Sequence, residues 1–478
     1  GIDIGTSGVK AILMDGGGEV LHQAVTPMPV SRPNPLWSEQ DPADWWRATC
    51  DAVLQLPGDL RQIVEAIGRS GQMHGATLLD RSDAPIRPAI LWNDGRSAKA
   101  CTTLEARVPN FRSLTGNLAM PGFTAPKLIW LAEHEPENFK RIAKVLLPKD
   151  YVRLLMTGDY ASDMSDSAGT TWMDVGRRDW SDQVLSACGL SRAHMPDLFE
   201  GSEVTGALRP EIAAQLGLTP GALVVGGGGD NAAGAVGVGV LEPGHAFLSL
   251  GTSGVLFVAD GAFQPNADRG VHTFCHAVPG LWHQMAVMLS AASCVDWAVR
   301  LTGAASAETL ISQAERDGEL PSNVPVFLPY LSGERTPHND PNAKGVLFGL
   351  THDTEAAEIA QAVLEGVALA FADGLSVLPT RGAIETITVI GGGSRSRYWG
   401  RILAAALDKP LTYRKFADVG PALGAARLAQ VGATGKSATE FKPPEIQHVI
   451  EPDRHDVAVM ADKLPRFRRL YETTNDLL

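Results

Sequence analysis

One carboxylate follows directly after four consecutive glycines, at residues 226–229. The apolar run at residues 222–225 predicts a buried strand before them, and Asp230 comes next. Because glycine has no side chain, another molecule can approach this backbone closely. A carboxylate in so crowded a place needs hydrogen bonds, a metal ion or a proton to accept. Asp230 is therefore a candidate general base, and a simple helix N-cap is the alternative.

A five-residue segment occurs twice, about half a chain apart. Residues 5–9 and 251–255 both read Gly-Thr-Ser-Gly-Val, and both lie between apolar runs. Each copy predicts a hairpin whose turn offers backbone N–H groups and hydroxyls to a phosphate. Neither copy is a Walker loop, because no Gly-Lys-Ser/Thr follows. The repeat predicts two similar domains, and two ordinary hairpin turns are the alternative.

The two copies of the repeat differ in one charged residue. Asp3 precedes the first turn, whereas Ser249 takes the equivalent place before the second. One half of the chain therefore places a carboxylate beside its predicted phosphate-binding turn. This arrangement suits a hydrated Mg²⁺ ion, so Asp3 is the predicted metal-binding residue.

Other predicted strand ends carry glycine or hydrogen-bonding side chains. Residues 391–393 are three glycines between a strand-like and a helix-like stretch, which favours nucleotide binding, although a packing turn is the alternative. Residues 72–74 and 93–96 each follow a predicted strand and suit a polyol, although His74 can also be a structural histidine. His272, Cys275, His276 and His283 are candidate metal ligands by type, but their spacing matches no standard zinc site.

Length and composition limit the class of protein. A chain of 478 residues exceeds one ordinary core, so we expect two domains, at residues 1–240 and 241–478. The net charge of −13 argues against nucleic acid or an anionic membrane as a main partner. Five cysteines without paired spacing are typical of reduced thiols in a cytoplasmic protein. We find no apolar run of membrane-spanning length and no signal peptide.

Several motifs resemble those of the FGGY carbohydrate kinases. Residues 122–131, and residues 345–350 together with 358–365, are similar to the two signature patterns of that family. Residues 35–42, 71–80, 90–96 and 333–339 resemble most closely the bacterial members that phosphorylate xylulose. The resemblance runs essentially from end to end. It implies an α/β fold of two actin-like (ribonuclease H-like) domains with an active-site cleft between them.

The resemblance also implies roles for individual residues. Residues 1–240 would bind the sugar and carry the catalytic base Asp230, and residues 241–478 would bind the nucleotide. Asp3 matches the acid near magnesium. The residues matched to the sugar are Met73, His74, Asp230 and Asn231, and those matched to ATP are Gly251, Thr252, Gly392 and Gly393. Our own analysis of the strand ends and turns adds Gln72, Asn93 and Arg96 at the sugar and Gly5, Thr6 and Ser7 at the phosphates.

The implied activity is ATP-dependent phosphorylation of D-xylulose to D-xylulose 5-phosphate in the breakdown of D-xylose, with Mg²⁺. Three alternatives stay open: a kinase for another pentulose such as ribulose, a non-catalytic actin-like ATP switch, and a sugar sensor without chemistry. The expected partners are the sugar and ATP, with no nucleic acid and no membrane, and a homodimer is conceivable.

Overall fold

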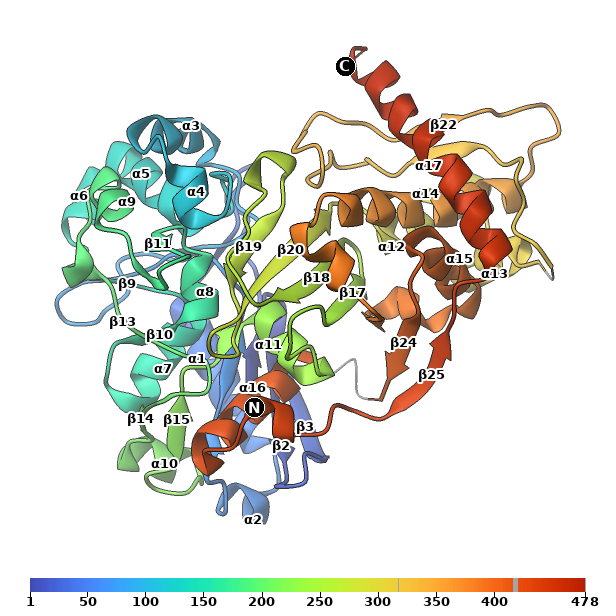
Figure 1. Cartoon of the computed structure of the whole chain (residues 1–478). Coiled ribbons are helices and arrows are strands. Elements are labelled where there is room, and N and C mark those ends of the chain that lie inside the picture. The colour runs from blue at the N-terminus through green and yellow to red at the C-terminus, as the bar shows by residue number, and fades with distance from the viewer. Residues whose placement is uncertain (317, 416–419, 478) are drawn as a thin grey trace.

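A computed structural model of the chain describes residues 1–316, 318–415 and 420–477. Two main sheets, each flanked by helices, form the two halves of the molecule (Figure 1). The first sheet has the strand order β16–β6–β1–β2–β3. Its strands are β1 (Ile2–Ile4), β2 (Gly8–Met14), β3 (Val20–Pro27), β6 (Arg69–Gly71) and β16 (Gly228–Gly229). The predicted strand at residues 222–225 is β15 (Leu223–Val225), which pairs with β14 (Val204–Ala207) and β5 (Ala66–Ile67).

The second sheet has seven strands, in the order β19–β20–β18–β17–β23–β24–β25. They are β17 (Ala246–Leu250), β18 (Gly254–Asp260), β19 (His272–Cys275), β20 (Trp282–Met288), β23 (Ile387–Ile390), β24 (Leu411–Arg414) and β25 (Ile446–Ile450). In the described part of the chain, the remaining strands form five short pairs: β4 (Glu39–Gln40) with β8 (Ala89–Ile90), β7 (Thr77–Leu79) with β9 (Lys144–Leu146), β10 (Ala161–Asp163) with β13 (Asp197–Phe199), β11 (Met173–Asp174) with β12 (Asp179–Trp180), and β21 (Val326–Leu328) with β22 (Val346–Phe348).

The two main sheets share one topology. The order β3–β2–β1–β6–β16 in the first corresponds to β20–β18–β17–β23–β24 in the second, with the same strand directions. The two Gly-Thr-Ser-Gly turns therefore join equivalent strands. Their registers differ by one residue, because Ile4 pairs with Val9 whereas Leu250 pairs with Gly254. The predicted α/β fold of two like domains is confirmed.

Helices cover both sheets and connect them. The first half contains α1 (Pro42–Leu54), α2 (Gly58–Arg61), α3 (Ala98–Arg107), α4 (Phe111–Thr115), α5 (Thr124–His134), α6 (Pro136–Lys140), α7 (Pro148–Thr157), α8 (Met164–Ala168), α9 (Asp182–Ala187), α10 (Pro210–Leu216) and α11 (Asp230–Val238). The second half contains α12 (Ala292–Thr302), α13 (Ala307–Ala314), α14 (Ala356–Ser376), α15 (Arg397–Leu407), α16 (Gly420–Thr434) and α17 (Arg454–Asn475).

Helix α16 packs against the first sheet, although its sequence belongs to the second half (Figure 1). Its contact with α11 is made by small residues, because a Cβ on Gly424 would lie 1.6 Å from the Ala233 carbonyl oxygen. A Cβ on Gly68 would likewise lie 1.8 Å from the Ala425 carbonyl oxygen. The division at residues 240 and 241 stays a prediction, and α16 shows that the two halves of the sequence are interleaved in space.

Helix α14 runs through the interior of the second half. It is long and apolar enough to span a membrane by length and composition, so our expectation that no such run exists was wrong. It is mostly buried, however, and even its polar residues Gln361, Glu365 and Asp373 are covered. Gln361 bonds to Tyr398 of α15, and Glu365 and Asp373 pair with Lys463 and Arg468 of α17. Because these partners satisfy its polar side chains, the helix needs no solvent-facing surface.

Candidate active site

Three parallel strands of the first sheet end side by side. Gly229 pairs with Gly71, and Gly71 pairs with Ile4, across β16, β6 and β1. The chain continues from these three positions to Asp230, Gln72 and Gly5. The shared sheet edge thus brings together a carboxylate, a sugar-side loop and a phosphate-type turn from distant parts of the sequence.

Asp230 is the first residue of α11, and Gly229 takes the N-cap position. The alternative role of Asp230 as a helix N-cap is therefore not observed. Its Oδ1 accepts hydrogen bonds from the Asn231 backbone N–H at 2.7 Å and from Asn231 Nδ2 at 2.9 Å. Burial, together with the nearby charge of Asp3, raises the pKa of Asp230 to about 7. Such a carboxylate can accept a proton near neutral pH.

Asp3 lies in the next strand but one, opposite Ser70. The Ser70 hydroxyl donates to Asp3 Oδ1 at 2.6 Å. Burial raises the pKa of Asp3, and this hydrogen bond offsets part of that effect. The described residues contain no group of three or more side chains able to cage a metal ion. Mg²⁺ commonly needs only one or two carboxylates besides phosphate and water, so Asp3 fits the predicted role chemically.

The backbone of His74 has a left-handed conformation, with φ of 69°. Its carbonyl oxygen accepts from Lys127 Nζ at 2.7 Å and from the Thr124 hydroxyl at 3.1 Å. Its ring contacts the edge of Phe123 at 4.8 Å. Lys127 is fully buried and also donates to the Gly122 carbonyl, a supporting role that the sequence analysis did not predict. The position of Lys127 just inside α5, among apolar residues, was the available signal.

Met73 is buried against two glycines. A Cβ on Gly229 would lie 2.9 Å from Met73 Cγ, and a Cβ on Gly169 would lie 2.7 Å from Met73 Cε. Gly229, the residue before Asp230, is thus required by the packing of Met73.

The side chains of Thr6 and Gln72 are bonded to each other. The Thr6 hydroxyl donates to Gln72 Oε1 at 3.0 Å and accepts from Trp92 Nε1 at 3.0 Å. Gln72 Nε2 donates to Gln40 Oε1 at 2.7 Å. Both side chains therefore join loops, and their ligand roles stay predictions. The exposed Ser7 next to Thr6 has its hydroxyl available for a ligand.

Arg96 is buried by its own neighbours. Its guanidinium makes bonds of 2.7 Å to Asp94 Oδ2 and Glu39 Oε1 and stacks on Trp37 at 3.6 Å. This side chain holds the loop after β8, and its predicted contact with a sugar remains untested. Asn93, two residues after the buried Leu91, is exposed at the same loop.

The predicted nucleotide residues come together at the edge of the second sheet. Ser249 pairs with Ile390, so the turn at Gly251 lies beside the glycines that follow β23. Gly391 has φ of 91°, and a Cβ there would lie 2.8 Å from the Leu250 carbonyl oxygen. The carbonyls of Gly251 and Thr252 accept the N–H groups of Ala292 and Ala291 at the start of α12. Gly392 and Gly393 form the 3₁₀ turn just beyond.

Residues of the second half also border the predicted sugar site. The Phe274 ring lies 6.3 Å from the His74 ring, and the His272 ring lies 5.5 Å from Phe123. His272 Nδ1 shares a 2.8 Å hydrogen bond with Asn117 Oδ1 from the first half. These contacts place the candidate site between the two halves.

The histidines that resembled a metal cluster do not gather around one point. Phe274 and Phe257 lie between the rings of His272, His276 and His283, and the His276 and His283 rings are 5.9 Å apart. Burial lowers the pKa of all three, so each is a neutral core side chain.

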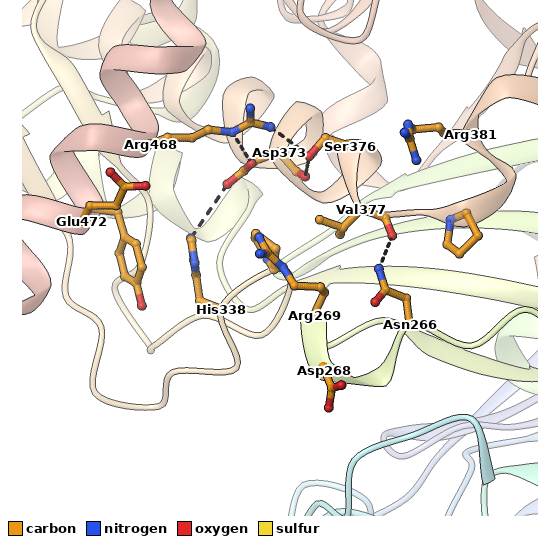
Figure 2. Close-up of a pocket in the computed structure, with 13 residues that line it drawn as sticks. Asn266, Asp268, Arg269, His338, Asp373, Ser376, Val377, Arg381, Arg468 and Glu472 are labelled. Atoms are coloured by element: carbon orange, nitrogen blue, oxygen red, sulfur yellow. Dashed lines mark hydrogen bonds and ion pairs between the residues drawn. The ribbon is translucent and has the colours of Figure 1, made fainter. Parts of the chain in front are cut away.

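A cavity of about 840 Å³ lies elsewhere in the second half (Figure 2). On its wall, Asp373 Oδ1 lies 2.6 Å from Arg468 Nε, and Asp373 Oδ2 lies 3.9 Å from His338 Nε2. Arg269 and Arg381 add positive charge at its lining. None of the predicted site residues lines this cavity, so its size alone does not make it the active site.

Comparison with known proteins identifies the family to which the chain is similar. The sequence pattern of the FGGY family of carbohydrate kinases matches at residues 1–237 for its N-terminal domain and at residues 246–433 for its C-terminal domain. The chain is 57% identical to the xylulose kinase of Escherichia coli (strain K12), covering 99% of this chain and 98% of that protein. The crystal structure of a xyloylose kinase from Brucella ovis superimposes with a TM-score of 0.96 at 49% identity, over 100% and 99% of the two chains. That of a xylulose kinase from Rhodospirillum rubrum has a TM-score of 0.92 at 30% identity, over 100% and 99%.

Proposed function

Because this chain belongs to the FGGY family of carbohydrate kinases, we propose that it transfers the γ-phosphoryl group of ATP to D-xylulose. The observation that supports D-xylulose as the substrate is the 57% identity, over nearly the whole chain, to a relative named xylulose kinase. The product is D-xylulose 5-phosphate, formed at the terminal hydroxyl of the sugar.

Asp230 is the proposed general base of this reaction. Its carboxylate accepts the proton of the terminal hydroxyl while that oxygen bonds to the γ-phosphorus, and the bond from phosphorus to the β,γ-bridging oxygen breaks to release ADP. A pKa near 7 leaves a substantial fraction of Asp230 ionised at neutral pH. His74 and Met73 contact the sugar in this proposal, with Asn231 beside the base.

The nucleotide lies against the turns of the two sheets. We assign the phosphates to the turns at Gly5 and Gly251 and the rest of the nucleotide to the turn at Gly392. Asp3 is the residue that would hold Mg²⁺, and a bound cation would neutralise phosphate charge during transfer. The glycines at these positions let phosphate oxygens reach backbone N–H groups.

The test is ADP release from the purified chain with ATP, Mg²⁺ and a panel of ketoses. We expect the highest kcat/KM for D-xylulose, because a site built around hydrogen bonds rejects an epimer that leaves its polar groups unpaired. A higher value with D-ribulose would assign another pentulose. ADP release that no sugar stimulates would favour an ATP switch and would exclude the proposal.

A further inference from the structure

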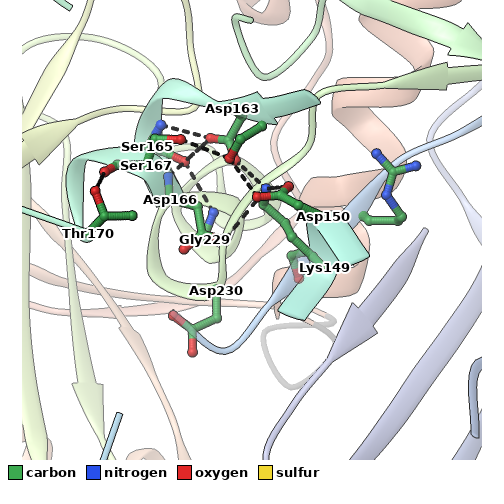
Figure 3. A network of polar contacts seen from close by, with 12 residues as sticks. Lys149, Asp150, Asp163, Ser165, Asp166, Ser167, Thr170, Gly229 and Asp230 are labelled. Carbon is green, nitrogen blue, oxygen red and sulfur yellow. Dashed lines mark hydrogen bonds and ion pairs between the residues drawn. The ribbon is translucent and has the colours of Figure 1, made fainter. Parts of the chain in front are cut away.

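A buried ionic network lies directly behind Asp230 (Figure 3). Lys149 lies at the start of α7. Its Nζ is 2.5 Å from Asp150 Oδ1, 2.7 Å from Asp163 Oδ1 and 3.5 Å from Asp166 Oδ2. All four residues are almost completely buried. Burying charges in this way is costly, and apolar residues of similar volume often give equal or greater stability. A network of this kind therefore calls for a role other than stability.

Ser165 connects this network to β16, the strand that ends just before Asp230. Asp163 Oδ2 accepts the Ser165 backbone N–H at 2.7 Å and the Ser165 hydroxyl at 2.5 Å. Because a hydroxyl has a single proton, the Ser165 oxygen is left as an acceptor. It accepts the Gly229 N–H at 3.1 Å, and Gly229 is the residue immediately before Asp230. In Figure 3 the Asp230 carboxylate points away from the network.

The same short segment also holds His74. The Gly169 carbonyl, one residue beyond α8, shares a 2.7 Å hydrogen bond with His74 Nδ1. A carbonyl can only accept, so the His74 proton is on Nδ1 and its Nε2 is an acceptor. Gly169 is required here, because a Cβ on it would lie 2.6 Å from His74 Cε1.

The segment is anchored through Lys149 to the loop that carries Met73 and His74. The Lys149 side chain packs against Gly71, since a Cβ on Gly71 would lie 3.2 Å from Lys149 Cβ. A Cβ on Gly75 would lie 2.6 Å from Pro148 Cγ, at the same end of α7. Both ends of the Met73–His74 loop therefore rest on the first turn of α7.

We propose that Asp163, Ser165 and Gly169 form a positioning platform, in which Asp163 and Ser165 orient Asp230 while Gly169 orients His74. This inference rests on the proposed function, because it assigns Asp230 and His74 to the sugar. The platform holds two groups of the proposed sugar site from one short segment. The sugar then meets a base whose backbone is held at Gly229 and an imidazole whose acceptor nitrogen is free.

The test compares Ser165→Ala with Ser167→Ala. Both serines are buried in α8, and the Ser167 hydroxyl donates only to the Ser162 hydroxyl, at 2.8 Å. Misplacing a catalytic group slightly can cost up to about a hundred-fold, so we expect Ser165→Ala to lower kcat for xylulose by roughly ten-fold. KM for ATP should stay unchanged, and Ser167→Ala should remain within about two-fold of the parent rate. Ser165→Cys, which keeps the volume but accepts hydrogen bonds weakly, should behave as Ser165→Ala and guards against a folding failure.

A double-mutant cycle with Asp230→Asn separates positioning from a general structural effect. If Ser165 acts through Asp230, Ser165→Ala should cause no further loss of rate in the Asp230→Asn background. An equal further ten-fold loss there, or equal losses from Ser165→Ala and Ser167→Ala, would overturn the platform. Full activity of Asp230→Asn would instead overturn the proposed base, so the two failures can be told apart.

Discussion

At the scale of single residues, the central feature is a pair of carboxylates in one sheet, Asp3 in β1 and Asp230 just after β16, with β6 between the two strands. Burial raises the pKa of both carboxyl groups, and the charge of Asp3 raises the pKa of Asp230 further. Nothing in folding favours such a pair. A site that receives a cation and releases a proton gives a physical reason for it.

We predict that Asp230→Asn stabilises the protein while it abolishes most of the reaction. Folding raises the pKa of Asp230 to about 7. Ionisation of this carboxyl group therefore lowers the free energy of unfolding as the pH rises from about 4 to 7. Asn cannot ionise and can still accept from Asn231. Its Tm should therefore exceed that of the parent at pH 8, by more than at pH 5.

The same variant should lose on the order of a hundred- to ten-thousand-fold in kcat, the usual contribution of a positioned base. Thermal melting at the two pH values and steady-state rates check both parts. A Tm that falls at pH 8 would contradict the electrostatic argument even if activity were lost.

At the scale of elements, the two equivalent hairpins perform different tasks. β1–β2 brings Asp3 to the turn, and β17–β18 brings Ser249 to the corresponding place. The first turn is also tied to the sugar side through Thr6, whereas the second is tied to the start of α12. The two equivalent hairpins thus differ in the neighbours to which they are bonded.

We predict that Asp3→Asn lowers kcat and weakens productive use of Mg²⁺ and ATP, with little change in sugar affinity. Ser249→Ala, in the equivalent strand, should be much milder because it removes no charge. Rates measured over a Mg²⁺ titration distinguish the two variants. Similar losses from both would remove the asymmetric role of the hairpins.

The contact between α11 and α16 depends on glycine. We predict that Gly424→Ala destabilises the fold by at least about 1–3 kcal/mol, because its Cβ would overlap the Ala233 carbonyl and force the helices apart. Gly382→Ala is the matched control, since no atom lies within 4 Å of a Cβ there. Denaturant unfolding of both variants measures the difference, and equal stabilities would contradict the packing argument.

At the scale of the whole molecule, the candidate site is divided between the halves. Asp230, Asp3 and His74 come from the first sheet and its loops, while Gly251 and Gly392 come from the second. Arg112 and Asp268 form an ion pair of 2.5 Å across the two halves. A ligand that contacts both sides favours the arrangement in which the halves are closest.

We therefore predict that xylulose together with a non-hydrolysable ATP analogue makes the molecule more compact. The expected result is a smaller radius of gyration in small-angle X-ray scattering with both ligands than with neither. Asp3→Asn with the same ligands serves as the control, because weaker nucleotide binding should reduce the change. An unchanged radius at saturation would count against closure.

The sequence by itself determined the duplicated hairpins, the strand before Asp230 and the resemblance to a family, because these depend on local pattern and on short motifs. It also predicted β23 and the helix after it from alternating apolar runs and glycines. Local patterns cannot specify which side chains bond to each other across the fold. Only the tertiary structure decided that Thr6, Gln72 and Arg96 join loops, and that Lys127 and Ser165 support the site. It also decided that α16 covers the first sheet and that the polar side of α14 is buried. Each of these outcomes depends on partners far apart in the chain, whose positions are fixed only when both sheets are assembled.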